Sequence, residues 1–255
     1  MAPSPTVRAF CVGQAKSGTA SLAGLLSRRR TAHEPERDLL LDAILRRDRG
    51  DLATGDLRAW LEARDRRLQL EYDIAWANQF IAADLAAVFG SARFVVLVRD
   101  PWTWLDSIVG HLLSRAIPRE VQDFLDWWFR PGQWPHTRHD AGLKARGLPS
   151  AAAFIAAWAR HIDTCARDLP SARRLVVRTH ELGASAVRLA SFLQIDASTL
   201  DTTRGHANRR TFEGSLEALL PAHHVDGIVG DLAGAHLARL FPGVVTRTDA
   251  LRLWA

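Results

Sequence analysis

Two glycines with a lysine between them follow the first apolar segment of the chain, in a pattern typical of anion-binding loops. Residues 7–12 are mostly apolar and predict a strand, Gly13 follows directly, and Gly18 opens a segment with helical character. Glycines permit a sharp turn and a close approach of backbone to ligand, and the unpaired N–H groups of a helix start face any anion docked there. Lys16 adds a mobile positive charge. The residues expected to bind the anion are Gly13, Ser17, Gly18, Thr19, Ala20 and Ser21, together with Lys16.

The order of these residues argues against a nucleoside triphosphatase. The loop of such enzymes ends in Gly-Lys-Ser/Thr, whereas Lys16 here precedes Gly18. The hydroxyl that binds Mg²⁺ in those enzymes is therefore out of register. A ligand-free turn from strand to helix would explain the glycines alone. It explains Lys16 less well, because only two of the 33 lysine and arginine residues in the chain are lysines.

A second candidate anion site follows the clearest apolar strand, residues 94–98. Arg99 comes directly after this strand, Pro101 is placed to start a helix, and Ser107 lies one to two turns into that helix. An arginine and a serine that converge at the end of a strand suit a phosphate group. The alternative is that Arg99 caps a neighbouring carbonyl group and Ser107 faces the core.

Strand-like and helical segments alternate over nearly the whole chain, which is typical of a three-layer α/β/α fold with a mostly parallel central sheet. With the loop described above, the fold is expected to be of the P-loop nucleotide-binding type. We expect one domain over residues 1–255, with a lid or acceptor-side insertion around residues 117–149. The predicted strands are residues 7–12, 31–35, 68–73, 94–98 and 174–177. The main predicted helices are residues 18–28, 38–67 with a break near Gly50 and Gly55, 75–89, 102–115, 121–129, 150–169 and 184–193.

Taken together, the two motifs resemble those of the sulfotransferase family. The stretch from Lys16 to Leu22 is similar to the family's KSGTxSL loop, and the stretch from Arg99 to Ser107 is similar to its RDPxxxxxS motif. A third stretch, residues 174–193, resembles the family's late strand and the helix after it, although that pattern is generic. The resemblance favours the bacterial and carbohydrate-type members over the cytosolic animal type, because the Lys-Thr-His pattern of the animal enzymes is missing.

The resemblance implies transfer of a sulfuryl group from 3′-phosphoadenosine 5′-phosphosulfate to a hydroxyl or amine, without a metal ion. The first loop would bind the 5′-phosphosulfate end of the donor, and Arg99 and Ser107 would bind its 3′-phosphate. The product would be 3′-phosphoadenosine 5′-phosphate. Lys16 would stabilise the charge that develops in the transition state. The acceptor would be a small molecule or a glycoconjugate.

The acceptor needs a general base, and the sequence offers several. In related bacterial and carbohydrate-type enzymes an acidic residue after the second strand often has this role. Glu34 is therefore the first choice and His33 the second, although this segment could equally be a solvated surface turn. Glu71 and Asp73, near the third strand, are rivals.

Two further features remain open at this stage. Arg209 and Arg210 belong to a basic segment that, in the family, often closes over the donor, so they are candidates for the 3′-phosphate. The tryptophans near the expected lid predict either a hydrophobic acceptor pocket or ordinary core packing. They form a cluster with a neighbouring phenylalanine: Trp127, Trp128, Phe129 and Trp134.

Composition narrows the class of protein. The net charge of +5 comes from arginines interleaved with acids, which suggests solvated helix faces rather than a nucleic-acid surface. The longest apolar stretches are shorter than the roughly 18–20 residues of a membrane span, and the first residues lack the pattern of a secretory signal. Cys11 and Cys165 have no zinc-binding spacing. We therefore expect a cytoplasmic protein with no nucleic-acid partner, no membrane span and no metal.

Two other functions fit part of these observations. A small-molecule kinase would share the fold and the first loop, and it would bind ATP with Mg²⁺; the position of Lys16 speaks against it. A non-catalytic nucleotide-binding protein would keep Lys16, Arg99 and Ser107 for binding alone, and it would lack a working base.

Overall fold

The computed structural model describes residues 6–114, 119–204 and 216–254. These residues form two compact units. Unit 1 contains the described residues up to Val98 and those from Thr164 to Arg204, and unit 2 contains those from Arg99 to Asp163 and from Leu216 onward. Whether residues 1–255 behave as one domain with a lid around residues 117–149 stays a prediction.

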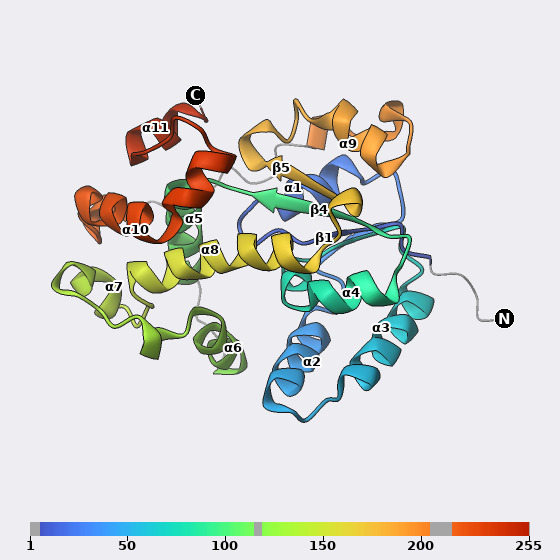
Figure 1. Ribbon diagram of the computed structural model, residues 1–255, viewed down its shortest axis with the longest axis horizontal. Helices are drawn as coiled ribbons and strands as arrows, with labels where there is room; N and C mark the ends of the chain where they lie inside the picture. Colours follow the sequence, from blue (N-terminus) through green and yellow to red (C-terminus); the bar gives the residue numbers. More distant parts are fainter. Residues whose placement is uncertain (1–5, 115–118, 205–215, 255) are drawn as a thin grey trace. The chain divides into compact units, whose positions relative to one another are not determined.

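Unit 1 is built on a sheet of five parallel strands in the order β2-β3-β1-β4-β5 (Figure 1). In β1, Ala9 pairs with Tyr72 of β3 on one side and with Arg93 of β4 on the other. The parallel pairing and the helices between the strands confirm the predicted α/β class. The strands are β1 (Ala9–Cys11), β2 (Thr31–His33), β3 (Tyr72–Ile74), β4 (Arg93–Val98) and β5 (Arg174–Arg178).

Helices cover both faces of this sheet. Successive side chains of a strand point to opposite faces, and the buried residues of β1 and β4 therefore lie on both. Cys11, Val95 and Leu97 belong to a core cluster with residues of α1 (Thr19–Leu25) and α9 (Ala186–Leu193). The intervening Phe10 points to the other face, where its ring lies 5.1 Å from that of Phe89. That face carries α3 (Thr54–Leu68) and α4 (Ala82–Val88), and α2 (Arg37–Arg49) lies beside them (Figure 1).

The strand order places the loop after β1 where ligands bind in folds of this kind. β1 has β3 on one side and β4 on the other, so the chain reverses its direction of travel across the sheet at β1. In open α/β sheets, ligands bind outside the carboxyl ends of the strands at such a switch point. The loop that carries Lys16 leaves the sheet there.

Two predicted elements end differently from the sequence pattern. The strand expected over residues 68–73 is shorter, because α3 continues through Leu68 and ends where Gln69 adopts a left-handed conformation with φ 53°. The helix expected over residues 75–89 begins as a 3₁₀ segment, η1 (Trp76–Ile81), before α4. There the buried Asn78 donates a hydrogen bond to the carbonyl oxygen of Cys11 at 3.1 Å, which fixes this segment against the sheet.

The described part of unit 2 is helical. It contains α5 (Pro101–Leu113), α6 (Arg119–Phe129), α7 (Ala141–Lys144), most of α8 (Ala151–Asp168), α10 (Ala222–Leu240) and α11 (Arg247–Arg252). Trp128 and Phe129 are buried, with ring centroids 4.4 Å apart, and Phe129 packs on Phe154 of α8. These two members of the aromatic cluster are therefore core residues, whereas Trp127 and Trp134 are half-buried.

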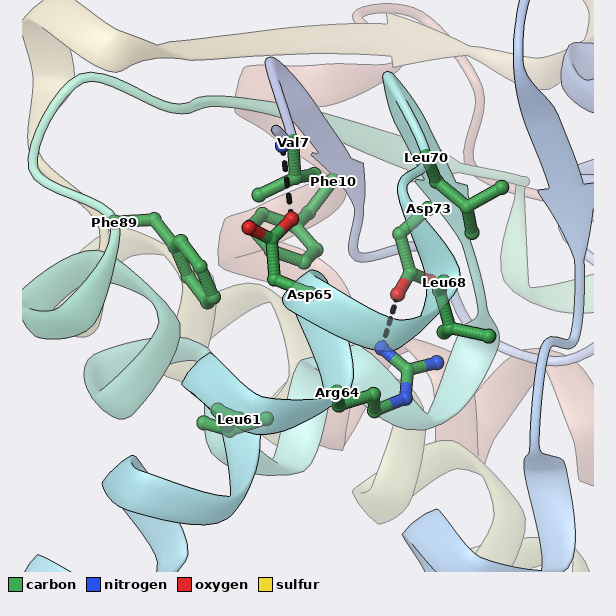
Figure 2. Close-up of a pocket in the computed structure, with 9 residues that line it drawn as sticks. All are labelled: Val7, Phe10, Leu61, Arg64, Asp65, Leu68, Leu70, Asp73 and Phe89. Carbon is green, nitrogen blue, oxygen red and sulfur yellow. Dashed lines mark hydrogen bonds and ion pairs between the residues drawn. The ribbon is translucent and has the colours of Figure 1, made fainter. Parts of the chain in front are cut away.

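A small cavity lies in unit 1 between α3 and the sheet (Figure 2). Its volume is about 10 Å³, enough for no more than one water molecule. Arg64 and Asp73 point toward one another in its wall. The cavity is too small for a nucleotide, so the candidate site has to be sought among the loops at the carboxyl ends of the strands.

Candidate active site

The loop after β1 is wound so tightly that two of its positions have no room for a side chain. A Cβ atom on Gly13 would lie 2.6 Å from Ser17 Oγ and 2.7 Å from Leu97 Cβ. Gly18 has φ 97°, in the left-handed region, and a Cβ atom there would lie 2.8 Å from Thr179 Cγ2. The conformation of the loop therefore requires both glycines.

Hydrogen bonds inside the loop fix its shape. The backbone N–H and the hydroxyl of Ser17 both donate to the carbonyl oxygen of Gln14, at 3.1 Å and 2.6 Å. Thr179, just after β5, donates from Oγ1 to the carbonyl oxygen of Ser17 at 2.7 Å. The hydroxyl proton of Ser17 is thus used within the loop. Thr179 has no signal in the sequence, because its role depends on the neighbouring strand end.

Lys16 adopts a left-handed backbone conformation, with φ 69°, and its side chain is half-buried. Such a conformation is uncommon for a residue with a Cβ atom and costs on the order of 1 kcal/mol or more. The bonds around Ser17 hold it in place. The helix that follows, α1, starts at Thr19 and ends at Leu25, earlier than the expected Arg28.

Three of the predicted site residues come together between the start of α1 and the end of β2. Nε2 of His33 lies 3.0 Å from Thr19 Oγ1 and 3.6 Å from Glu34 Oε1. Which of these atoms carries the proton depends on the tautomer of the imidazole. Burial lowers the pKa of His33, which favours a neutral ring between the loop and Glu34.

The carboxyl group of Glu34 is held in an environment that favours its protonated form. The side chain is 17% exposed; Oε1 accepts a hydrogen bond from the Trp76 N–H at 3.3 Å. Oε2 is buried and has no hydrogen-bond partner among the described residues. Burial, aided by the charge of Asp73, raises the pKa of Glu34 to about 7, against the opposing effects of the Trp76 N–H and Arg37. A carboxyl group with such a pKa is suited to exchange protons near neutral pH.

The two rival carboxylates are engaged elsewhere. Asp73 is buried, pairs with Arg64 and accepts a hydrogen bond from Asn78 at 3.2 Å. Glu71 precedes β3 and so lies at the opposite end of this strand from the loops of the site. Burial tends to raise the pKa of Glu71, but hydrogen bonds from Arg29 and Arg30 outweigh this effect and lower it. Of these three carboxylates, Glu34 alone has a buried oxygen without a hydrogen-bond partner among the described residues.

In unit 2, Arg99 is ordered by residues of α5 and of the C-terminal segment. Its Nε donates to Thr103 Oγ1 at 2.9 Å, and its guanidinium lies 4.7 Å from the centroid of the Trp254 ring. Asp100 caps α5 by accepting from the Thr103 N–H at 2.8 Å, and it also accepts from the Trp254 indole at 3.0 Å. Burial lowers the pKa of Arg99, while Asp100 and Asp106 oppose this.

Ser107 lies one helical turn beyond Thr103, so the two residues share a face of α5. Thr103 and Trp254 contact the candidate residue Arg99 and were not predicted from the sequence. Thr103 could have been found from its i, i+4 relation to Ser107. Trp254 could not, because 154 residues separate it from Asp100, its hydrogen-bond partner.

The expectations for the basic segment, for a metal and for a membrane span concern residues that the structure describes only in part. Arg209 and Arg210 lie outside the described residues, so their roles stay predictions. Within residues 6–114, 119–204 and 216–254, no group of three or more His, Cys, Asp or Glu side chains is arranged to hold a metal ion. In that same part of the chain, no helix combines the length and apolar character needed to cross a membrane.

A family model described as a sulfotransferase domain matches residues 8–201. The chain belongs to the sulfotransferase family. The matched range includes both motifs and Glu34, and the protein is accordingly an enzyme that transfers sulfuryl groups.

Solved sulfotransferase structures match this chain at low sequence identity. A sulfotransferase from Alicyclobacillus acidocaldarius matches with a TM-score of 0.53 and 15% identity, over 92% of this chain and 94% of that one. The sulfotransferase STF9 from Mycobacterium avium matches with a TM-score of 0.49 and 14% identity, over 96% of this chain and 79% of that one. The first of these structures shows the shared fold. A comparison with curated proteins gave no match.

The tight winding of the loop leads to a first prediction for this sulfotransferase. Gly13→Ala should lower the free energy of unfolding by about 1–3 kcal/mol, because the added methyl group meets Ser17 and Leu97. Urea denaturation measures the change. Gly55→Ala, in the first turn of α3 with no atom near its Cβ position, is the matched control and should be neutral or stabilising. A Gly13→Ala protein as stable as the control would show that the loop is less tightly packed than described.

Proposed function

We propose that this sulfotransferase uses 3′-phosphoadenosine 5′-phosphosulfate as donor and a hydroxyl or amine of a small molecule or glycoconjugate as acceptor, with Glu34 as the general base. The observation that carries the proposal is the buried Glu34 carboxyl group, which has one oxygen without a partner among the described residues and adjoins the phosphate loop through His33 and Thr19. An acceptor hydroxyl would supply the missing hydrogen bond to Oε2.

The donor contributes the sulfuryl group, and the residues of this chain bind and orient it. We assign its 5′-phosphosulfate end to the loop of Gly13, Ser17, Gly18 and Thr19, with Lys16 as the charged group. Because Ser17 uses its hydroxyl proton within the loop, its contribution is to hold the loop's conformation. Arg99 and Ser107 are assigned to the 3′-phosphate, and Thr103 orients the Arg99 guanidinium.

Glu34 would act on the acceptor. Its carboxylate takes the proton from the acceptor hydroxyl as the acceptor oxygen bonds to sulfur. The bond between sulfur and the phosphate oxygen breaks at the same time, and 3′-phosphoadenosine 5′-phosphate leaves. Negative charge develops on the oxygen of the leaving phosphate, and Lys16 stabilises it. His33, which lies 3.0 Å from Thr19 Oγ1 and 3.6 Å from Glu34 Oε1, is the alternative base.

The order of the residues in the loop supports sulfuryl over phosphoryl transfer. A kinase needs a hydroxyl and a carboxylate placed for Mg²⁺, whereas the hydroxyl after Lys16 precedes Gly18 and is out of register for that role. We therefore rank the kinase alternative below the sulfotransferase on the position of Lys16.

The cytoplasmic location expected from the sequence stays a prediction.

Lys16 can be tested by transfer of ³⁵S from labelled donor to a panel of hydroxyl and amine acceptors. Lys16→Ala should lower turnover by about 10²-fold or more, because it removes charge stabilisation in the transition state. Lys144→Ala is the matched control, because Lys144 is the only other lysine and is exposed on α7. Equal turnover in the two variants would remove Lys16 from the mechanism, and no transfer to any acceptor by the wild-type enzyme would contradict the proposed reaction.

Arg99 should act on donor binding. Arg99→Gln removes a charged hydrogen-bonding partner worth roughly 1.5–3 kcal/mol, so the affinity for 3′-phosphoadenosine 5′-phosphate should fall by about 10- to 100-fold. Isothermal titration calorimetry measures this. Arg252→Gln, an exposed arginine on α11 of the same unit, should bind as tightly as the wild type. If Arg99→Gln keeps full affinity, the 3′-phosphate lies elsewhere.

Glu34 gives a prediction in stability as well as in turnover. Its folded-state pKa of about 7 lies above the ordinary 4.5. The folded protein therefore binds more protons than the unfolded chain between these pH values, and stability falls as pH rises through this window. Glu34→Gln removes the effect, so the variant should gain stability relative to the wild type between pH 4.5 and 7 in urea denaturation.

The same variant should lose turnover but keep its affinity for 3′-phosphoadenosine 5′-phosphate. In the wild type, the rate should rise with pH through about 7, as Glu34 becomes the carboxylate. Glu62→Gln, an exposed residue of α3, is the control for turnover and should retain it. Normal turnover of Glu34→Gln would move the base to His33.

A further inference from the structure

The turn that presents Glu34 is strained. Glu34 and Glu36, on either side of Pro35, both adopt left-handed conformations, with φ 56° and φ 49°. Residues with a Cβ atom rarely do so, and each such position costs on the order of 1 kcal/mol or more. Two of them within three residues persist only where the surrounding structure holds them. This turn connects β2 to α2, so it also sets the direction in which the Glu34 carboxyl group points.

Two arginines of α3 hold this turn, and they act on different groups. Arg67 donates to both carboxylate oxygens of Glu36, at 2.8 Å and 2.7 Å, whereas the buried Arg64 bonds to the backbone at Pro35. Arg64 is 4% exposed, and its NH2 group donates to the carbonyl oxygen of Pro35 at 2.7 Å. Its Nε lies 3.5 Å from Glu36 Oε2, and its NH1 group pairs with Asp73 of β3. Figure 2 shows Arg64 and Asp73 pointing toward one another between α3 and the sheet. A single side chain thus joins α3, β3 and the turn.

The sheet side of the turn leaves little other freedom. The Glu34 N–H donates to the carbonyl oxygen of Ile74 at 2.9 Å, and the Trp76 N–H donates to Glu34 Oε1 at 3.3 Å. If the contacts of Arg64 are lost, the strained residues can relax away from β3, and these two bonds are the first to be affected.

We propose that Arg64 is the positioning residue of the active site, which holds the turn of residues 34–36 and so keeps the Glu34 carboxyl group oriented and shielded from water. The inference rests on the proposed role of Glu34 as the base. Arg64 touches neither substrate nor reacting atoms, so it acts only through the turn.

The planar fork of arginine explains why this residue type is present. Arginine can donate to Pro35 and Asp73 at the same time in fixed directions, whereas lysine offers a point charge on a flexible stem. The burial of the ion pair is also informative. Desolvation offsets much of the attraction within a buried ion pair, so such a pair contributes little to stability. The role we infer for the pair of Arg64 and Asp73 is therefore to fix one conformation of the turn.

Loosening the turn should change the surroundings of Glu34 in a measurable way. The charged and titratable groups that act on it are Asp73 on β3, Arg37 on α2, His33 on β2 and Cys11 on β1. Burial is the largest cause of its raised pKa. Water entering the relaxed turn would remove that cause.

The test compares Arg64→Lys with Arg58→Lys in the full chain. Arg58 lies on the same helix and is 3.2 Å from Asp84, which is 1% exposed, so its replacement weakens an ion pair to a buried carboxylate without touching the turn. ¹³C NMR titration, assigned with Glu34→Gln, follows the Glu34 carboxyl group, and hydrogen exchange follows its backbone N–H. Neither measurement needs an acceptor.

In Arg64→Lys we expect the pKa of Glu34 to move from about 7 toward 4.5 and its N–H to exchange faster. In Arg58→Lys neither should change. If Arg64→Lys leaves both readouts at their wild-type values, or if Arg58→Lys changes them equally, the positioning role is overturned. Should Arg64→Lys fail to fold, the double variant Arg64→Gln with Asp73→Asn removes both charges together. Only hydrogen exchange of the Glu34 N–H is then read, because loss of the Asp73 charge by itself lowers the pKa of Glu34.

Turnover separates this inference from the proposed function. If Glu34→Gln is inactive and Arg64→Lys keeps the wild-type rate and pH profile, Arg64 has no positioning role and Glu34 remains the base. If Glu34→Gln is active, the base assignment is wrong, and the NMR and exchange data still decide whether Arg64 holds the turn.

Discussion

The site depends on a steric constraint at the carboxyl end of β1. The backbone at Gly13 runs so close to Ser17 and to Leu97 of β4 that no Cβ atom fits between them. This close approach turns the chain out of the sheet at the point where the strand order reverses. Thr179, after β5, then braces Ser17 from the other side. The loop is therefore shaped by the core beneath it before any ligand binds.

A second constraint concerns the end of β2, where local preferences are broken. Glu34 has an unfavourable backbone conformation and a buried oxygen without a partner among the described residues. Departures of this kind are expected at functional sites, where the rest of the structure compensates for them. Here the compensation comes from α3, where Arg67 bonds to Glu36 and the buried Arg64 bonds to Pro35. The low exposure of Arg64 and its three partners distinguish it from the many surface arginines of the chain.

The sequence predicted the fold class and the loop well, because both leave local signals. The apolar strand before Gly13, the spacing to Gly18 and the apolar run of β4 need no knowledge of tertiary contacts. The roles of Thr179, Arg64 and Trp254 could not be predicted, because each depends on contacts between segments far apart in the chain. Likewise, the choice among Glu34, Glu71 and Asp73 required their burial and partners, which residue type alone does not reveal. The hydrogen bond that the Ser17 hydroxyl donates within the loop could not be predicted from residue type either.

In the proposed function, the loop around Lys16 serves a donor with two separated phosphate groups and not a nucleoside triphosphate. Isothermal titration calorimetry of the wild-type enzyme with 3′-phosphoadenosine 5′-phosphate, and separately with ATP and Mg²⁺, distinguishes the two ligands. We expect tight binding of the bisphosphate that is independent of Mg²⁺, and much weaker binding of ATP. Preferential binding of ATP that requires Mg²⁺ would contradict it.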